Sequence, residues 1–247
     1  GRGDVPVALI TGASRGIGAA CAAGLAARGY DVGLTYAEDR AGAERAAAAV
    51  EGHGRRAHVQ RAEAREAGAA SGMVAAAEAA LGPLDALVAN AGLTRDGLAV
   101  RMSDDDWRAP LEVNLAGTAA AARAALAAMV PRGRGCIVAI SSIVGVRGNA
   151  GQANYAASKA GIIGLVRGLA REAGPAGVRV NAVAPGYVRT RLTDALPGDL
   201  RERLLAATAL GRLGEPEDVA GPVAFLCSDA AAFVTGTVMA VDGGLRI

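Results

Sequence analysis

The chain has 247 residues, 52% of them apolar, and a net charge of only +2 from 26 Lys+Arg against 24 Asp+Glu. That length suits a single domain with one large core, and the balanced, scattered charge disfavours nucleic-acid binding. Two histidines and three widely separated cysteines indicate neither a metal site nor a disulfide framework, and no run of eighteen uncharged apolar residues occurs, so we expect a cytoplasmic protein without metal or membrane partner.

The predicted elements alternate between strand and helix along the chain. We treat residues 1–4, GRGD, as an expression remnant outside the fold. Short apolar runs predict buried strands at Val5–Thr11, Asp31–Tyr36, Ala57–Gln60, Leu84–Ala89, Gly135–Ser141, Val178–Ala184 and Val238–Val241. Ala-rich stretches predict helices at 16–28, 41–51, 69–81, 104–130, 153–173 and 215–228. This order predicts one α/β domain over residues 1–247, a doubly wound, Rossmann-type, seven-stranded parallel sheet with helices on both faces.

A glycine-rich loop, TGASRGIG, follows the first predicted strand. Its glycines, Gly12, Gly16 and Gly18, have the spacing G-x-x-x-G-x-G rather than G-x-G-x-x-G. A tight turn that merely packs a helix on a strand would use the same residues. Because the loop lies between an apolar strand and an Ala-rich helix, its amides can face a pyrophosphate, and we interpret it as a dinucleotide site.

The second predicted strand bears on the choice between NAD and NADP. An acidic residue at the carboxyl end of this strand binds the ribose 2′-OH of NAD, and an arginine there makes room for the 2′-phosphate of NADP. Asp31 begins the strand, on the wrong side of the sheet, and Tyr36 ends it with Arg15 nearby. We therefore expect NADP(H), with NAD(H) as the less favoured alternative because Glu38 and Asp39 also lie within reach.

One lysine, Lys159, stands among 25 arginines. Tyr155 precedes it by one helical turn, so both side chains project from one face, and a neighbouring ammonium is expected to lower the pKa of the phenol. Ser142 follows the fifth strand at the edge where ligands of such sheets bind, and Asn114 lies in a predicted helix. Each residue also has an ordinary reading, as a half-buried helix residue, a cap or a backbone partner.

Taken together, these segments resemble the short-chain dehydrogenase/reductase family over essentially the whole chain. The resemblance is carried, in order, by TGASRGIG, NAG at 90–92, Asn114, Ser142, Tyr155-x-x-x-Lys159 and PGYVRT at 185–190. Within the family, the segments LTRD, GNAGQANYAASKAG and LGRLGEPEDVA look most like the beta-ketoacyl-acyl-carrier-protein reductases.

The resemblance implies a role for each of four catalytic residues. Tyr155 would donate a proton to a substrate carbonyl, Ser142 would orient that carbonyl, and Asn114 would position a water. Lys159 would hold the nicotinamide ribose and lower the pKa of Tyr155. The implied cofactor-binding residues are Thr11, Gly12, Arg15, Gly16, Ile17, Gly18, Tyr36, Asn90, Ala91, Gly92, Tyr155, Lys159, Pro185, Gly186, Val188 and Thr190.

The sequence departs from the family pattern at two places. Ala62 and Glu63 stand where relatives carry Asp and an apolar residue against adenine, and this leaves Arg61 as a possible phosphate partner. Arg132 and Arg134 could meet an acidic carrier protein, but Ala176 stands where a second docking arginine is expected. The resemblance also implies a mobile substrate lid at 190–213 and a homotetramer formed through the helices at 104–130 and 153–173 and the last strand.

Three hypotheses for the function follow. The leading one is NADPH-dependent reduction of a 3-oxoacyl thioester, on acyl carrier protein or coenzyme A, to the 3-hydroxyacyl thioester. The second is a reductase or dehydrogenase of another ketone or secondary alcohol, such as a polyketide, sugar or steroid. A third, from a different class, is a scaffold that binds NADP without turnover, which would need neither Asn114, Ser142 nor Tyr155.

Overall fold

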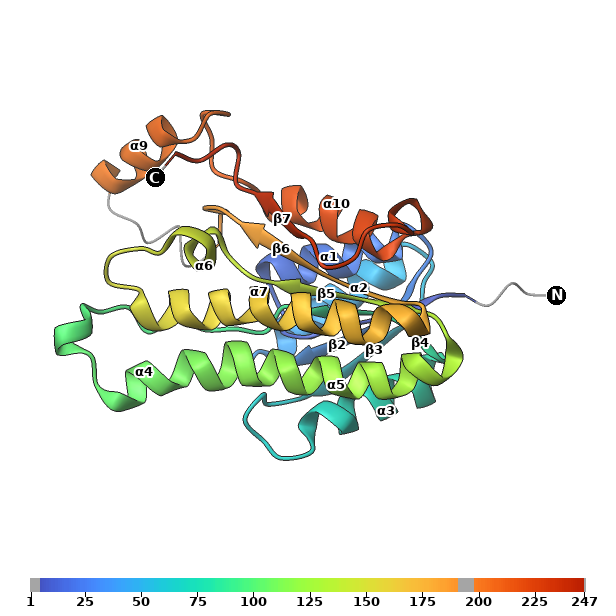
Figure 1. The fold of residues 1–247 in the computed structure, drawn as a ribbon. Coiled ribbons are helices and arrows are strands. Elements are labelled where there is room, and N and C mark those ends of the chain that lie inside the picture. Colours follow the sequence, from blue (N-terminus) through green and yellow to red (C-terminus); the bar gives the residue numbers. More distant parts are fainter. Residues whose placement is uncertain (1–4, 191–197, 247) are drawn as a thin grey trace.

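The computed structural model describes residues 5–190 and 198–246. Its centre is a seven-stranded parallel sheet in the order β3-β2-β1-β4-β5-β6-β7 (Figure 1). The predicted doubly wound fold is confirmed, and every predicted strand is present to within two residues at each end. The strands are β1 (Val7–Ile10), β2 (Asp31–Tyr36), β3 (Ala57–Arg61), β4 (Leu84–Ala89), β5 (Gly135–Ile140), β6 (Val178–Pro185) and β7 (Val238–Val241).

Helices cover both faces of the sheet (Figure 1). One face packs against α1 (Gly16–Ala26), α2 (Arg40–Gly52) and α10 (Pro216–Cys227). The other packs against α3 (Ala69–Leu81), α5 (Gly117–Met129) and α7 (Ala153–Ala173). Each face buries its own apolar cluster, and alternate residues of a strand go to opposite clusters, as Ala8 and Leu9 of β1 do. The sheet is thus a rigid platform whose carboxyl ends all open on one edge.

The predicted helix at 104–130 is not one continuous α-helix. Asp104–Pro110 form α4, capped by the Ser103 hydroxyl, which accepts a hydrogen bond from the Asp106 amide. The next six residues, Leu111–Ala116, form a π-helix before α5 begins. The stretch Asp104–Arg132 is long and apolar enough to pass for a membrane span, but its buried stripe, including Ala122, Ala125 and Met129, packs on the sheet. Its apolar character is that of a core helix.

Two helices were absent from the sequence prediction. Residues Ile143–Arg147 form α6 directly after β5, and Gly198–Ala207 form α9. The sequence analysis assigned no element to the first stretch, and the second falls within the expected lid at 190–213. Helix α6 has only five residues and packs on α7, which local helix propensity does not report. Part of the expected lid, 191–197, lies outside the described residues.

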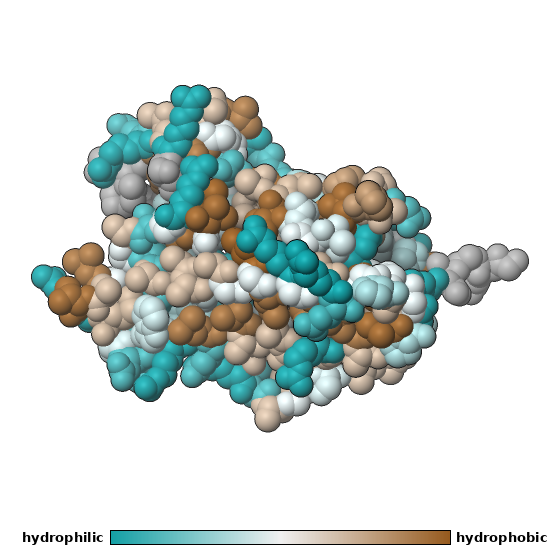
Figure 2. Space-filling view, in the orientation of Figure 1, coloured by the Kyte–Doolittle hydropathy of each residue, from teal (hydrophilic) through white to brown (hydrophobic). Residues whose placement is uncertain are grey.

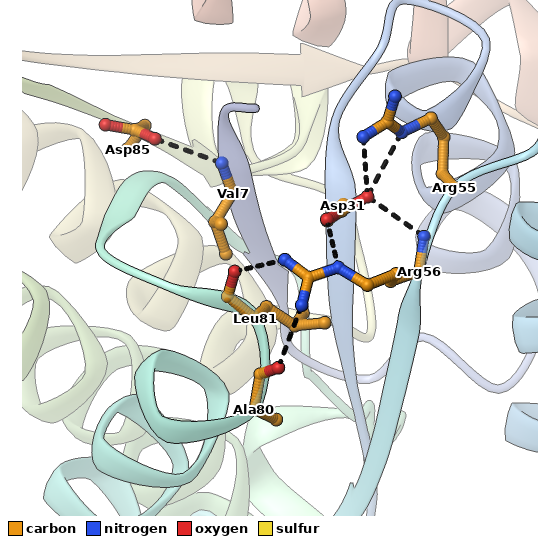
Figure 3. A network of polar contacts seen from close by, with 7 residues as sticks. All are labelled: Val7, Asp31, Arg55, Arg56, Ala80, Leu81 and Asp85. Carbon is orange, nitrogen blue, oxygen red and sulfur yellow. Dashed lines mark hydrogen bonds and ion pairs between the residues drawn. The ribbon is translucent and has the colours of Figure 1, made fainter. Parts of the chain in front are cut away.

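Asp31 lies at the amino edge of the sheet, as expected from its position in the second strand. Its carboxylate is 1% exposed and accepts hydrogen bonds from Arg55 Nη2 at 2.8 Å, Arg56 Nε at 2.7 Å and the Arg56 amide at 2.9 Å (Figure 3). Arg56 in turn donates to the carbonyls of Ala80 and Leu81 at the end of α3. Asp31 therefore joins β2, β3 and α3 and lies at the opposite edge from the glycine loop.

Apolar side chains reach the surface over the helices of the α7 face (Figure 2). Among them are Trp107 of α4, 41% exposed, and Val130 at the end of α5, 40% exposed. Strand β7 forms one edge of the sheet.

The Asp31→Asn variant is predicted to lose about 2–4 kcal/mol of folding free energy at pH 7, because two guanidiniums lose their shared counter-charge. Burial raises the pKa of Asp31, but the hydrogen bonds from Arg56 and Arg55 outweigh it and hold the pKa below its ordinary value. This contribution is present above the unfolded pKa of about 3.9 and is lost as the pH falls through the folded value. Urea unfolding measured from pH 7 down to pH 4 should show that the difference in unfolding free energy between wild type and variant begins to narrow near pH 4. Glu44→Gln, which removes an exposed ion pair, is the control and should cost at most about 0.5 kcal/mol; an Asp31→Asn loss no larger than that would contradict the prediction.

Candidate active site

The glycine loop brings the start of α1 to the carboxyl edge of the sheet. Gly12 has φ +64°, and a Cβ there would lie 2.9 Å from Ala91 Cα, so only glycine fits between the two strand ends. A Cβ at Gly18 would lie 2.4 Å from the Gly12 carbonyl oxygen. Arg15, the N-cap residue of α1, supplies no side-chain cap, so the first-turn amides of α1 are not satisfied by it. This end of α1 fits a pyrophosphate.

Thr11 and Asn90 lock the loop to the end of β4. Thr11 Oγ1 accepts from the Asn90 and Ala91 amides at 2.9 Å and 3.0 Å. Asn90 Nδ2 donates to the carbonyls of Thr11 at 3.1 Å and Gly12 at 2.9 Å. The two side chains that the family resemblance assigned to cofactor binding are thus each bonded to main-chain groups of the other segment, and they fix the conformation of the loop.

A small cavity opens beside this loop at the ends of the first four strands. Its walls include Thr11, Thr35, Ala62, Glu63 and Thr118. The pair that departs from the family pattern, Ala62 and Glu63, therefore lines a cavity at this edge of the sheet, with the small Ala62 standing at the position where relatives carry an Asp. Thr35 and Thr118, which the sequence analysis did not identify, contribute from β2 and α5.

Several arginines surround the carboxyl end of β2. Tyr36 ends the strand, and both Arg40 and Arg61 lie near enough to interact electrostatically with its phenol. Arg15 Nη1 lies 3.8 Å from Asp39 Oδ2. Arg40 and Arg61 pair at 2.8 Å with Glu44 and Glu66, in ion pairs that are at least half exposed. Exposed pairs of this kind contribute little free energy, so these guanidiniums can exchange partners readily. The sequence analysis named Arg15 and Arg61 but missed Arg40.

Tyr155 and Lys159 lie one turn apart on α7, as predicted. Lys159 Nζ is 5.6 Å from the centre of the Tyr155 ring and donates to the Ile140 carbonyl at 2.8 Å. The lysine side chain is 3% exposed. A Cβ on Gly92 would lie 3.5 Å from Nζ, so the end of β4 also closes on the ammonium.

The expected direction of the Tyr155 pKa is wrong for the chain by itself. Burial raises the pKa of Tyr155, Ser142 acts in the opposite direction through a side-chain hydrogen bond, and the charge of Asp96 raises it further. Lys159 is not among these influences, and its own pKa is lowered to about 8 by burial. Desolvation of the phenol itself decides the direction, and the helical spacing of Tyr155 and Lys159 does not report that burial.

Ser142 lies where β5 ends and α6 begins. Its Oγ accepts from the Val144 amide at 3.1 Å and so caps α6, and the residue is 8% exposed. Gly145 of α6 packs directly on α7, since a Cβ there would lie 2.6 Å from the Lys159 carbonyl carbon. Ser141 Oγ donates to the same carbonyl at 2.8 Å. Ser142 and Tyr155 are brought together by this close packing of α6 on α7.

Asn114 is fully buried in the π-helix and uses its side chain completely on protein partners. Oδ1 accepts from the Leu93 amide at 2.8 Å, and Nδ2 donates to the Leu93 carbonyl at 2.9 Å and to Ser158 Oγ at 3.0 Å. Asn114 therefore ties the loop after β4 to α7. The π-turn shifts the hydrogen-bond register here, so that the Gly117 amide donates to the Glu112 carbonyl.

Asn154, which was quoted in the sequence analysis but given no role there, is also fully buried. Its Nδ2 donates to the carbonyls of Arg95 at 2.7 Å and Asp106 at 2.8 Å, and its Oδ1 accepts from the Tyr155 amide at 2.7 Å. It fixes the start of α7 to α4 and to the loop before it. The available signal was an amide residue directly before the tyrosine, one helical turn before Ser158 on the same buried face.

The segment 185–190 lies next to the glycine loop. The Gly186 amide donates to the Val241 carbonyl at 2.9 Å, and Gly186 packs on Asp242 so closely that a Cβ would lie 2.8 Å from its Cα. Thr190 Cγ2 would touch a Cβ placed on Gly16 at 3.4 Å. Pro185 ends β6, and Val188 is buried and pairs with Gly214. The predicted residues of this segment thus border the same edge as Gly12 and Tyr155.

Arg132 and Arg134 lie at the other edge of the sheet. They precede β5, a strand of 6 residues that spans about 20 Å, whereas Ser142 follows it. Both contact Asp85, at 3.8 Å and 3.3 Å. Within one chain they do not line the mouth of the site, because the sequence order that places them before β5 also places them at its amino end.

Comparisons with known proteins agree with this geometry. A family model described as Enoyl-(Acyl carrier protein) reductase matches residues 12–246. The chain is 42% identical over 238 residues to the 3-oxoacyl-[acyl-carrier-protein] reductase FabG of Staphylococcus aureus strain Mu50, covering 96% of this chain and 97% of that one. It is 43% identical over 240 residues to FabG of Escherichia coli K12, covering 97% and 96%. A solved structure described as a short-chain alcohol dehydrogenase from Sinorhizobium meliloti 1021 has a TM-score of 0.92 at 37% identity and covers 97% of this chain and 95% of its own.

The Lys159→Met variant is expected to be more stable than the wild type at pH 7, by about 1–3 kcal/mol, because the buried ammonium destabilises the folded chain. The folded pKa of Lys159 is lowered to about 8, below the unfolded value of about 10.4, so wild-type stability should rise as the pH increases between these values. The advantage of the variant should therefore shrink from pH 8 to pH 10 in urea unfolding. Arg167→Met, on the exposed side of the same helix, is the control and should show no such pH dependence. A Lys159→Met protein less stable than wild type at pH 7 would be the opposite of what burial requires.

Proposed function

This chain belongs to the short-chain dehydrogenase/reductase family and is an NAD(P)-dependent oxidoreductase, and from this we propose that it reduces 3-oxoacyl thioesters to 3-hydroxyacyl thioesters with NADPH. The observation that carries the proposal is the convergence of Ser142, Tyr155 and Lys159 at the carboxyl edge of β5. The relatives named 3-oxoacyl-[acyl-carrier-protein] reductase support the substrate class, since they match nearly the full length of the chain.

The reduction needs a hydride and a proton. When bound, the nicotinamide supplies the hydride to the carbonyl carbon. The raised pKa of Tyr155 keeps its phenol protonated near neutrality, so the hydroxyl is a proton source for the carbonyl oxygen. Ser142 is the neighbouring hydroxyl that can donate a second hydrogen bond to that oxygen and stabilise the developing negative charge.

Lys159 has two tasks in this proposal. Its ammonium, held by the Ile140 carbonyl, has two donors left for the hydroxyl groups of the nicotinamide ribose. With a pKa lowered to about 8, it can also release a proton toward Tyr155 after each turnover at far less cost than an ordinary lysine. The side chain of Asn114 is engaged with Leu93 and Ser158. A water that takes part in this proton transfer would therefore be held by the main-chain carbonyl of Asn114 rather than by its side-chain amide.

The residues proposed to hold the cofactor follow the carboxyl edge. The uncapped amides of α1 and Gly12, Gly16 and Gly18 would take the pyrophosphate. The cavity beside Thr35 and Ala62 would take the adenine. The remaining proposed contacts are Arg15, Ile17, Tyr36, Ala91, Gly92 and the segment Pro185, Gly186, Val188 and Thr190, with Thr11 and Asn90 positioning the loop.

We also propose a homotetramer in the cytoplasm, built through α4–α5, α7 and the β7 edge. The exposed Trp107 and Val130 on these helices support it, as does the position of β7 at the end of the sheet, where an unpaired strand edge is usually covered.

A second candidate is a substrate that no carrier protein presents: a free ketone or, within the thioester proposal, the coenzyme A ester. The observation in its favour is that Arg132 and Arg134, the expected partners of an acidic carrier, contact Asp85 at the amino edge of the sheet. Docking of a carrier there would have to serve the active site of another chain in an oligomer.

The substrate proposal is tested by following NADPH oxidation with acetoacetyl-acyl carrier protein, acetoacetyl-CoA and a panel of simple ketones. We expect the two thioesters to be turned over, with kcat/KM at least tenfold above that of every ketone. Tyr155→Phe should bind NADPH as the wild type does and lose about 10²–10⁴-fold in kcat, because the proton source is gone. Tight NADPH binding with no turnover of any compound would support the scaffold hypothesis instead, and an active Tyr155→Phe variant would remove the proposed proton donor.

The cofactor proposal predicts that kcat/KM with NADPH exceeds that with NADH by at least about tenfold, because a 2′-phosphate gains charge-assisted hydrogen bonds from guanidiniums. Arg40→Gln and Arg61→Gln should each lower kcat/KM for NADPH by about 5- to 20-fold and change that for NADH less than twofold. Arg45→Gln, an exposed arginine on the same helix α2, is the control and should leave both unchanged. Equal rates with the two cofactors would contradict the preference.

A further inference from the structure

The amino edge of the sheet, opposite the nucleotide edge, holds a second cavity. It has a volume of about 610 Å³ and is lined by Val5, Asp31, Arg55, Pro83, Asp85 and Arg134, among others. This volume lies within the range of sites for small organic molecules, whereas a docking surface for a protein is flatter. Its walls come from the starts of β2, β4 and β5 and from the turn before β3, so the sheet itself fixes their geometry.

The charges around this cavity do not balance. Two carboxylates, Asp31 and Asp85, and three guanidiniums, those of Arg55, Arg56 and Arg134, line the cavity. Arg55 and Arg56 share Asp31 at 2.8 Å and 2.7 Å, and Arg134 shares Asp85, at 3.3 Å, with Arg132, which contacts it at 3.8 Å and is not part of the lining. The lining groups therefore carry one positive charge in excess, in a concave site where the field is focused.

The four guanidiniums differ in how far their donors are used. Arg56 donates to Asp31 and to the carbonyls of Ala80 and Leu81, as Figure 3 shows, so its guanidinium is already held by protein groups. Arg55 directs Nε and Nη2 to Asp31. Among the described residues, Arg134 contacts Asp85 alone, and its side chain is 59% exposed.

Arg132 contacts Asp85 through Nη2. Its Nε and Nη1 are buried and have no hydrogen-bond partner among the described residues. A buried donor without a partner destabilises the fold unless something else satisfies it. Arg132 does not line the cavity, so it adds a positive charge next to Asp85 without presenting these donors to a ligand.

We propose that this cavity binds a small organic phosphate, with the Arg55 and Arg134 guanidiniums holding the phosphate and Val5, Leu81 and Pro83 facing the carbon skeleton. Guanidinium forks match phosphate oxygens in geometry and charge, and a doubly charged phosphate compensates the excess charge better than a single carboxylate does. The apolar wall and the volume provide room for more than inorganic phosphate. The site is independent of the nucleotide edge and of the proposed reaction.

The test uses the full-length protein saturated with NADP⁺, which occupies the nucleotide edge. Binding of phenyl phosphate, inorganic phosphate and benzoate is measured by titration calorimetry at constant ionic strength set with sodium chloride. We expect phenyl phosphate to bind at least threefold more tightly than inorganic phosphate and at least fivefold more tightly than benzoate, which has the same ring with a carboxylate.

Two variants change the site in opposite directions. Arg134→Gln should weaken phenyl phosphate binding at least fivefold, and its exposed position leaves folding intact, which a melting curve checks. Asp85→Asn should strengthen binding at least threefold, because it removes the repelling charge while its amide oxygen can still accept from the Val7 amide. Arg108→Gln, an exposed arginine paired with Asp104 on α4, is the matched control and should change binding less than twofold. Undiminished binding by Arg134→Gln, no measurable binding by the wild type, or benzoate binding as tightly as phenyl phosphate would each overturn the proposal.

Discussion

The active site depends on one buried ammonium. Lys159 is nearly inaccessible to solvent, and burial disfavours its charge enough to lower its pKa to about 8. The fold positions the backbone of Lys159 as well as its side chain. Ser141 donates a hydrogen bond to the Lys159 carbonyl, and Gly145, which has no Cβ, allows α6 to pack against the same carbonyl. An arginine could neither be accommodated between Gly92 and Ile140 nor release a proton in this pH range. The only lysine of the chain therefore lies where the site needs a small cation that can titrate.

The parallel sheet separates two kinds of polar chemistry. Every strand runs in the same direction, so residues that follow strands gather at one edge and residues that precede them gather at the other. Ser142, Ala91 and Tyr36 belong to the first edge, and Asp31 and Arg134 to the second. The first edge has glycines, amides and hydroxyls that approach a ligand closely. The second has carboxylates and guanidiniums, with Asp31 joining three elements by hydrogen bonds and an excess of arginine around the cavity beside it.

Buried amide side chains connect the active site to its surroundings. Asn114 and Asn154 are both fully buried and each makes three hydrogen bonds, to the loop after β4, to α4 and to α7. Asn114 is part of the π-turn, which places it in a register that a regular helix would not give. Tyr155 is thus positioned from both sides by groups that touch no reacting atom. Removing either amide would leave buried backbone groups without partners.

The sequence by itself determined the alternation of strands and helices, the parallel sheet, the place of the glycine loop after β1 and the one-turn spacing of Tyr155 and Lys159, because these rest on periodicity, on glycine placement and on a four-residue helical spacing. It missed α6, which packs on α7, and also α9 and the π-turn, which local propensity does not report. Only the tertiary structure decided that Thr11 and Asn90 brace each other, that Arg40 joins Arg61 beside Tyr36, and that the Tyr155 pKa is raised. Hydrogen-bond partners and desolvation depend on which distant residues close around a group, and no spacing along a chain records that.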